Sequence, residues 1–198
     1  LSCNLSEIMI LVLGVIYAPI FGWQIPLLVS IQILFMNMVT DNLPALTLSF
    51  NPTSKDIMNE SPRKDSQLLN KSLIKLIFTT SVTMAVLTLI SYHIYGRTTA
   101  LVTLILVEIG AAFSFRSFRK ETLNRSPFVN KYLVVASLMS IFFTFVIIYT
   151  PAKVIFETYS IDFRSWGLSA LLVLVSLVFF DIIKKVNNKN LGYVNDTK

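Results

Sequence analysis

The sequence predicts an all-α protein, a polytopic membrane bundle of about six transmembrane helices. Of its 198 residues, 54% are hydrophobic and only 14% are charged, whereas soluble domains carry about 25% charged residues. Leu, Ile, Val and Phe gather into runs of about 20 residues, the length that an α-helix needs to cross about 30 Å of hydrocarbon. Six such runs use nearly the whole chain, so residues 1–198 are expected to form one membrane domain without an independent soluble domain.

The predicted helices follow one another with short connections. A Gly-Trp-Gln run at 22–24 lies between two prolines and predicts a tight turn, so the first two helices are expected to form a hairpin. The polar stretch 51–70 contains Asn-Pro and Ser-Pro turn signals, and Gly96 marks a later turn. The helices are expected at about 1–21, 25–50, 71–95, 99–115, 132–149 and 166–183.

The basic residues predict how the bundle is oriented. Fourteen of the 17 Lys and Arg residues lie in or beside the second and fourth connections and in the C-terminal tail, which share one side of the membrane if there are six crossings. The other side carries only Arg97, Lys153 and Arg164. The positive-inside rule then makes the C-terminus cytoplasmic in a multi-pass protein of the cell membrane. The net charge of +6 reflects this topology, so the lipid bilayer is an expected partner and nucleic acid is not.

Three carboxylates lie inside the predicted apolar helices, namely Glu7, Asp41 and Glu108. A charge at the centre of a membrane helix costs about 2.5 to 3.5 kcal/mol on insertion scales, so such residues are rare and usually functional. A single one could be protonated or lie beside water at a helix end. Three of them, with amides and hydroxyls alongside, favour a site.

The spacing of the polar residues places them on shared helix faces. Asn4 and Glu7 are three residues apart, and Asn37, Thr40 and Asp41 follow at i, i+3 and i+4. Measured from the turn between the first two helices, Glu7 and Asp41 both lie about 22 to 26 Å deep at 1.5 Å per residue. Glu108 lies only about 16 Å from its own outer turn by the same rise. Glu108 can therefore belong to the same site only if its helix is tilted or its outer turn lies deeper in the membrane.

Pro44 indicates what these residues bind. It has no N–H, so the carbonyl of Thr40 loses its helical partner and can turn toward a ligand. Unwound carbonyls beside carboxylates coordinate cations in transporters, and six to eight hard oxygen ligands suit Ca²⁺. Cys3, the only cysteine, and His93 do not fit such an oxygen site. Cys3 is expected to pack as a small apolar residue, and His93 to be solvated near an outer helix end.

The same residues carry a resemblance to a known family. The run Asn-Met-Val-Thr-Asp-Asn-Leu-Pro-Ala at 37–45, followed by Phe-Asn-Pro at 50–52, resembles the sixth transmembrane helix of P-type calcium-transporting ATPases. Asn-Leu-Ser-Glu at 4–7 resembles the fifth helix, and Asp-Ile-Met at 56–58 with Ser-Pro-Arg at 61–63 is similar to the connection that follows the sixth. Pro-Phe-Val-Asn-Lys at 127–131 and the segment that opens at Trp166 and holds Asp181 near its end are similar to the ninth and tenth helices. The resemblance covers almost the whole chain.

The resemblance implies a set of ion ligands and a transported ion. Ca²⁺ is the first expectation for that ion, and another cation is the second. Asn42 stands where that family more usually has Gly, and the run 110–112 lacks an amide common in the two-ion pumps. The positions that match the ion-binding residues of the family are Asn4, Glu7, Asn37, Thr40, Asp41 and Glu108.

The resemblance also implies parts that this sequence does not contain. Such pumps phosphorylate an Asp-Lys-Thr-Gly motif, and no such motif occurs here. ATP and Mg²⁺ would act only through domains outside this chain, and the chain alone is not expected to hydrolyse ATP. It begins at Leu1 within a predicted helix and without a signal-peptide pattern, which favours a fragment or truncated product. Its partner would be the N-terminal half of a P-type ATPase.

An alternative of a different class is a free-standing membrane protein derived from such a pump, acting as a partner subunit or a passive cation pathway. A coding region upstream that carries the phosphorylation motif would favour the pump. A native start codon at or just before Leu1 would favour the free-standing protein. A secondary transporter is less favoured, because no inverted repeat relates the two halves of the sequence.

Overall fold

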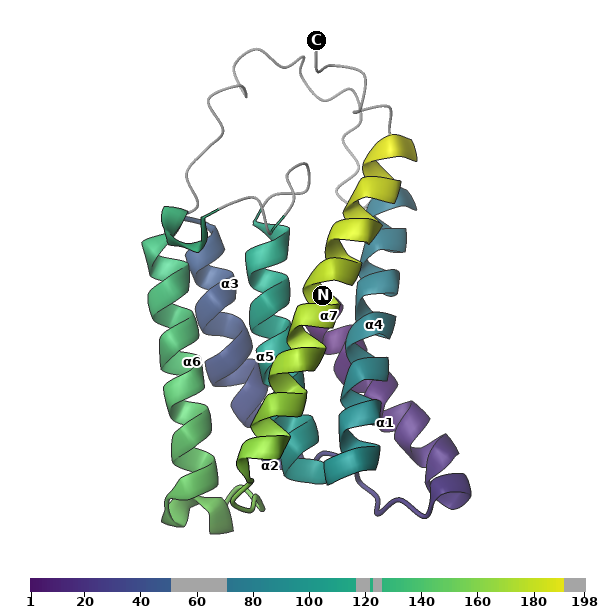
Figure 1. Ribbon diagram of the computed structural model, residues 1–198, viewed down its shortest axis with the longest axis vertical. Coiled ribbons are helices and arrows are strands. Elements are labelled where there is room, and N and C mark those ends of the chain that lie inside the picture. The colour runs from purple at the N-terminus through teal and green to yellow at the C-terminus, as the bar shows by residue number, and fades with distance from the viewer. Residues whose placement is uncertain (51–70, 117–121, 123–125, 191–198) are drawn as a thin grey trace.

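The computed structural model describes residues 1–50, 71–116, 122 and 126–190, and within these residues all regular structure is helical (Figure 1). The resemblance at 56–58 and 61–63 lies outside the described residues. The elements are α1 (Ser2–Phe21), α2 (Ser30–Phe35), the π-helical η1 (Met36–Asp41), α3 (Asn42–Leu48), α4 (Lys71–Tyr95), α5 (Arg97–Phe115), α6 (Lys131–Tyr149) and α7 (Phe163–Asn190), with short 3₁₀ turns η3 (Pro127–Val129) and η4 (Pro151–Val154).

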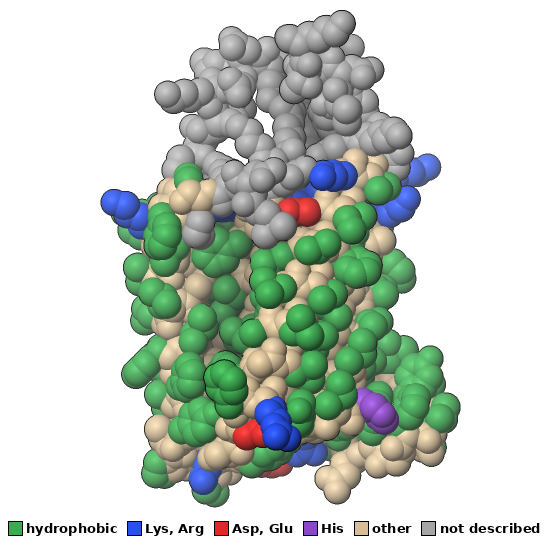
Figure 2. All heavy atoms as spheres, in the orientation of Figure 1, with side chains coloured by type: hydrophobic (Ala, Val, Ile, Leu, Met, Phe, Trp, Pro, Cys, Tyr) green, Lys and Arg blue, Asp and Glu red, His purple; other side chains and the backbone are tan. Residues whose placement is uncertain are grey.

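The helices have the length and composition of membrane spans. Five of them, α1, α4, α5, α6 and α7, are long and apolar enough to cross a bilayer. The remaining predicted crossing is the second along the chain. It corresponds to the unbroken succession of α2, η1 and α3, which covers 19 residues from Ser30 to Leu48. Figure 2 shows hydrophobic side chains over the flank of the bundle, with Lys and Arg near its two ends. The predicted all-α membrane bundle is confirmed.

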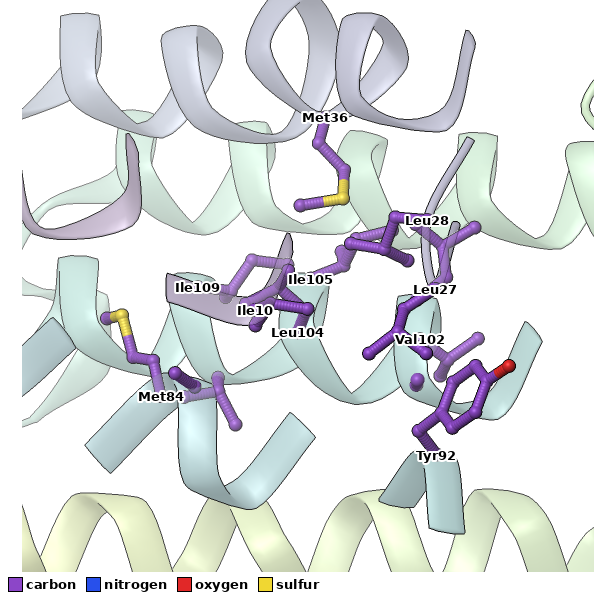
Figure 3. Close-up of a cluster of buried hydrophobic side chains, with 14 of the residues drawn as sticks. Ile10, Leu27, Leu28, Met36, Met84, Tyr92, Val102, Leu104, Ile105 and Ile109 are labelled. Carbon is purple, nitrogen blue, oxygen red and sulfur yellow. The ribbon is translucent and has the colours of Figure 1, made fainter. Parts of the chain in front are cut away.

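Helix α5 is the central helix of the bundle. It packs against α4 and α7 and against the segment that contains η1, and most of its side chains are buried. Figure 3 shows Leu104 and Ile105 of α5 among Ile10, Leu28 and Met36, which come from three other parts of the chain. A helix enclosed by protein can carry polar side chains without exposing them to lipid. This is the environment in which Glu108 lies.

The second predicted helix starts later than expected, at Ser30 and not near residue 25. Leu27 and Leu28 are fully buried although they lie in the irregular segment 23–29. Two neighbouring side chains bond to its backbone: the Tyr92 hydroxyl donates to the Gln24 carbonyl at 2.8 Å, and Arg97 donates to the Pro26 carbonyl at 3.0 Å. Because Leu27 and Leu28 are buried and these carbonyls are bonded, this segment is stable without a helix despite its hydrophobic sequence.

The first two predicted helices do not pack along each other as the expected hairpin would, because α1 packs mainly against α4. Helix α1 packs along α4, where the Ser81 hydroxyl donates to the Ser2 carbonyl at 2.9 Å, and it leans away from α3 and α6 in Figure 1. The segment 23–29 fills the space beside α1. A Cβ on Gly14 would lie 2.5 Å from Leu27 Cδ1. The absence of a side chain at Gly14 therefore permits this close approach.

Candidate cation site

The helix that carries most of the predicted ligands changes its hydrogen-bonding pattern where they occur. Asn37, Thr40 and Asp41 all lie in the π-helical segment η1, which ends three residues before Pro44. Proline removes the N–H that would bond to the carbonyl four residues earlier, and short π-helical stretches inside α-helices are frequent at functional sites. The Thr40 hydroxyl is buried and donates to the Met36 carbonyl at 3.0 Å. The expected irregularity before Pro44 is thus a widened helical turn.

One level of the site joins α1 to η1. The Asn37 amide donates to the two carboxylate oxygens of Glu7 at 3.1 and 3.4 Å and to the Ile33 carbonyl at 3.1 Å. Glu7 is 5% exposed. Because the amide N–H groups are used in these bonds, the Asn37 carbonyl oxygen remains an acceptor. The pair therefore presents oxygen atoms from two helices.

A second level, one helical turn away, joins α1, η1 and α5. One ligand atom each of Cys3, Asp41 and Glu108 lies within 4.8 Å of the other two. Glu108 is 3% exposed, and neither of its carboxylate oxygens has a hydrogen-bond partner among the described residues, nor does Asp41 Oδ1. Buried polar atoms of native proteins are nearly always bonded, so each exception requires an explanation.

The carboxylates of this site also lack basic partners. Within the described part of the chain, the ion pairs of Lys and Arg involve Glu157 and Asp181, and none involves Glu7, Asp41 or Glu108. Glu7, Asp41 and Glu108 are close enough to act on one another electrostatically. We call these three residues the carboxylate cluster. A cation is the group that would offset both their repulsion and their desolvation.

The helix starts explain why Glu108 meets Asp41 although their depths differ in the sequence. Glu108 lies eleven positions after Arg97, the first residue of α5, and Asp41 lies eleven positions after Ser30, the first residue of α2. The irregular segment 23–29 uses residues that would otherwise have placed Asp41 deeper. The depth mismatch is therefore absent from the folded bundle.

Two residues behave differently from their sequence-based interpretation. Asn4 is exposed on α1, and none of the described hydrogen bonds joins it to the other candidates. Cys3 packs against the hydrophobic core, as we expected, but it does not lie outside the site, because its Sγ is beside two carboxylates. The signal was the four-residue spacing of Cys3 and Glu7, which places both on one face of α1.

A second buried charged group lies beside the C-terminal end of α5, and its carboxylate and ammonium are paired with each other. The Lys184 ammonium lies 2.8 Å from Asp181 Oδ1 and donates to Thr122 Oγ1 and to the Ser114 carbonyl. Asp181 accepts from the Thr122 backbone N–H at 3.0 Å and from its hydroxyl at 2.7 Å. We call these four residues the Asp181 network. It holds residue 122 against α5 and α7.

Carboxylates buried inside a helical membrane bundle, without basic partners among the described residues, are typical of membrane proteins that move ions or protons. Residues 25–186 match the family described as cation transporting ATPase, C-terminus. The chain belongs to this family, as the C-terminal membrane region of a P-type cation pump.

Curated relatives include calcium-transporting ATPase 1 of Bacillus cereus, 31% identical over 93% of this chain and 23% of the relative. A calcium-transporting ATPase of Bacillus subtilis is 34% identical over 86% of this chain and 20% of the relative. One of Listeria monocytogenes is 27% identical over 90% and 21%. The chain therefore spans about a fifth of the length of these relatives.

Proposed function

We propose that this chain binds Ca²⁺ as the cargo of a P-type pump, through Glu7, Asn37, Thr40, Asp41 and Glu108. One observation carries the proposal: the carboxylates of Asp41 and Glu108 converge, with Glu7 close enough to act on both electrostatically. Oxygens of Asp41 and Glu108 are buried without a hydrogen-bond partner among the described residues. Similar proteins that are named calcium-transporting ATPases support Ca²⁺ as the ion.

The number of oxygens supports a Ca²⁺ site. The three carboxylates supply six oxygens and the Asn37 amide supplies a seventh, while Ca²⁺ takes six to eight oxygen ligands at 2.3 to 2.6 Å. Thr40 adds a hydroxyl and a carbonyl from the widened turn. Asn4 is exposed, so we assign it a ligand role only if α1 rotates, and the five other residues carry the binding.

In the complete transporter, this site would be coupled to phosphorylation elsewhere in the protein. ATP and Mg²⁺ would act through regions that this chain does not contain, and the chain would work together with the N-terminal half of the pump. Lys71, Lys75, Arg116, Lys131 and Lys184 all lie at the ends of helices that the topology puts on one side. Their excess supports a cytoplasmic position for that side and for the C-terminus.

Equilibrium binding of radioactive Ca²⁺ to the purified chain in detergent tests the proposal. We expect saturable binding in the wild-type chain and its loss in Asp41→Asn, because Asp41 lies between the partners from α1 and α5. The matched control is Asp162→Asn, which makes the same chemical change at an exposed carboxylate outside the membrane spans. Binding that survives in Asp41→Asn, or is lost equally in Asp162→Asn, contradicts the site.

A flux measurement separates the pump from the passive pathway. Reconstituted into sealed vesicles, the chain alone is expected to bind Ca²⁺ without releasing it across the membrane. Ca²⁺ efflux that requires Asp41 would instead support a free-standing cation pathway.

A further inference from the structure

The sulfur of Cys3 is a feature of the site that an oxygen-based Ca²⁺ site does not explain. Cys3 lies in the first turn of α1, is partly buried, and is the only cysteine in the chain. Its position on the helix is one turn before Glu7, on the face that α1 turns toward η1. Cys3 packs against the hydrophobic core, but its sulfur also lies close to two carboxylates, which apolar packing alone does not explain.

The distances among the three groups match a shared ion. The chosen atoms of Cys3, Asp41 and Glu108 all lie within 4.8 Å of one another, and two ligands on opposite sides of one ion at 2.3 to 2.6 Å are separated by about 4.6 to 5.2 Å. Both oxygens of Glu108 and one of Asp41 have no hydrogen-bond partner among the described residues. An ion between these groups would supply the bonds that their oxygens lack.

The chemistry of the donors indicates which ions gain from the sulfur. Ca²⁺ is a hard ion that binds oxygen, so Cys3 contributes little to its affinity. Thiolates select softer metals, and d¹⁰ divalent ions such as Zn²⁺ bind both thiolate sulfur and carboxylate oxygen. Cd²⁺ has nearly the ionic radius of Ca²⁺ but prefers sulfur, so the space that fits Ca²⁺ fits Cd²⁺.

We propose that Cys3, Asp41 and Glu108 form a mixed sulfur and oxygen site that binds a thiophilic divalent cation of the Cd²⁺ class. On binding, the metal forms a bond to the Cys3 sulfur and the thiol proton is released to water. The inference rests on the proposed cation site, because the same two carboxylates serve both ions. It implies that such metals occupy the site through a ligand that Ca²⁺ does not need.

The test is a titration of the purified chain in detergent with Cd²⁺, in the absence of Ca²⁺, followed by the thiolate-to-cadmium charge-transfer absorption in the ultraviolet. We expect a band that saturates at a single equivalent in the wild-type chain and no band in Cys3→Ser. Cd²⁺ affinity should fall about tenfold or more in Cys3→Ser, while Ca²⁺ affinity changes much less. Equal Cd²⁺ affinity in the two chains overturns the proposal.

A second variant shows whether the sulfur acts together with the carboxylates. Glu108→Gln should weaken the band, whereas an unchanged band would mean that Cys3 binds Cd²⁺ without the site, which also overturns the proposal. If Cys3→Ser does not fold, alkylation of the wild-type chain replaces it: Cd²⁺ should slow the modification of its single thiol, and an unchanged rate overturns the proposal.

Competition by Ca²⁺ distinguishes this inference from the function on which it rests. If excess Ca²⁺ abolishes the Cd²⁺ band, the thiophilic site and the proposed Ca²⁺ function are both supported. If the band requires Glu108 but Ca²⁺ never displaces it, the thiophilic site stands and the proposed Ca²⁺ function fails. If Ca²⁺ binds but Cd²⁺ produces no band, the Ca²⁺ function stands and the role of Cys3 fails.

Discussion

The carboxylate cluster and the Asp181 network both place carboxylates inside the bundle, but among the described residues only the second pairs its carboxylate with a basic side chain. In the Asp181 network, the ammonium and the carboxylate lie 2.8 Å apart, with Thr122 bonded to both. In the carboxylate cluster, Glu108 has the same degree of burial but no bonded partner among the described residues. Paired charges can be part of the stable fold, whereas unpaired ones are tolerated where a ligand completes them. The comparison separates a structural cluster from a binding cluster within one bundle.

The largest expected effect is on stability, in Asp181→Ala. The change leaves the Lys184 ammonium buried without its carboxylate, and breaking a buried pair in this way costs about 3 to 5 kcal/mol. Loss of helical circular dichroism on heating in detergent measures the effect. Asp181→Asn keeps an acceptor oxygen and should lose less.

A double variant shows whether the loss comes from the unpaired charge. Asp181→Leu combined with Lys184→Met removes both charges and should recover most of the stability, because apolar residues often replace buried pairs without cost. If Asp181→Ala unfolds at the wild-type temperature, the Asp181 network does not stabilise the fold.

Glu108→Gln should change the stability of the fold in the opposite direction to Asp181→Ala. Without Ca²⁺ it removes a buried carboxyl group that lies beside two others and has no hydrogen-bond partner among the described residues, so the fold should gain about 1 kcal/mol. With saturating Ca²⁺ the order should reverse, because a ligand at 100 times its Kd stabilises the wild-type chain by about 2.7 kcal/mol. Thermal unfolding with and without Ca²⁺ measures both. If Glu108→Gln lost as much stability as Asp181→Ala, Glu108 would be a structural residue and the carboxylate cluster would not differ from the Asp181 network.

Two Thr→Val substitutions compare a bonded hydroxyl with an unbonded one, because valine keeps the shape of threonine but has no hydroxyl. Thr122→Val removes a hydroxyl that bonds to both Asp181 and Lys184 and should cost about 1 to 2 kcal/mol. Thr88→Val removes a buried hydroxyl without a bonded partner among the described residues, so it should be neutral or slightly stabilising. Denaturant unfolding of both variants tests this. Equal costs would mean that hydroxyl pairing does not matter here.

The smallest effect concerns an exposed carboxylate, Asp162, which accepts from the Ser165 hydroxyl and backbone N–H at 2.7 and 3.0 Å. The hydroxyl bond is the main cause of a lowered pKa for Asp162. A lowered folded pKa contributes stability above the unfolded pKa of about 3.9, and this is lost as pH falls through the folded value. The difference in melting temperature between wild type and Asp162→Asn should therefore shrink on acidification. A difference that grows would contradict this sign.

Much of the bundle could be predicted because its causes are local. Runs of apolar residues mark the spans, and the ends of α1 at Phe21 and of α4 at Tyr95 lie beside Gly22 and Gly96, which both adopt positive φ. The segment 23–29 was the main error. Its apolar residues from position 25 onward favour a helix, but Tyr92 and Arg97 bond to its carbonyls from other helices, and no local pattern reports such partners.

The sequence by itself determined the membrane class, the apolar spans and the irregular turn before Pro44, because hydropathy, helix spacing and the missing proline N–H depend on neighbours along the chain. Only the tertiary structure decided that Glu108 meets Asp41, that Cys3 joins them, that Asn4 faces outward and that Asp181 pairs with Lys184. These outcomes depend on the late start of α2, the lean of α1 and the packing of α5 against its neighbours. They depend on the distances between helices, and the spacing of residues within one helix does not predict those distances.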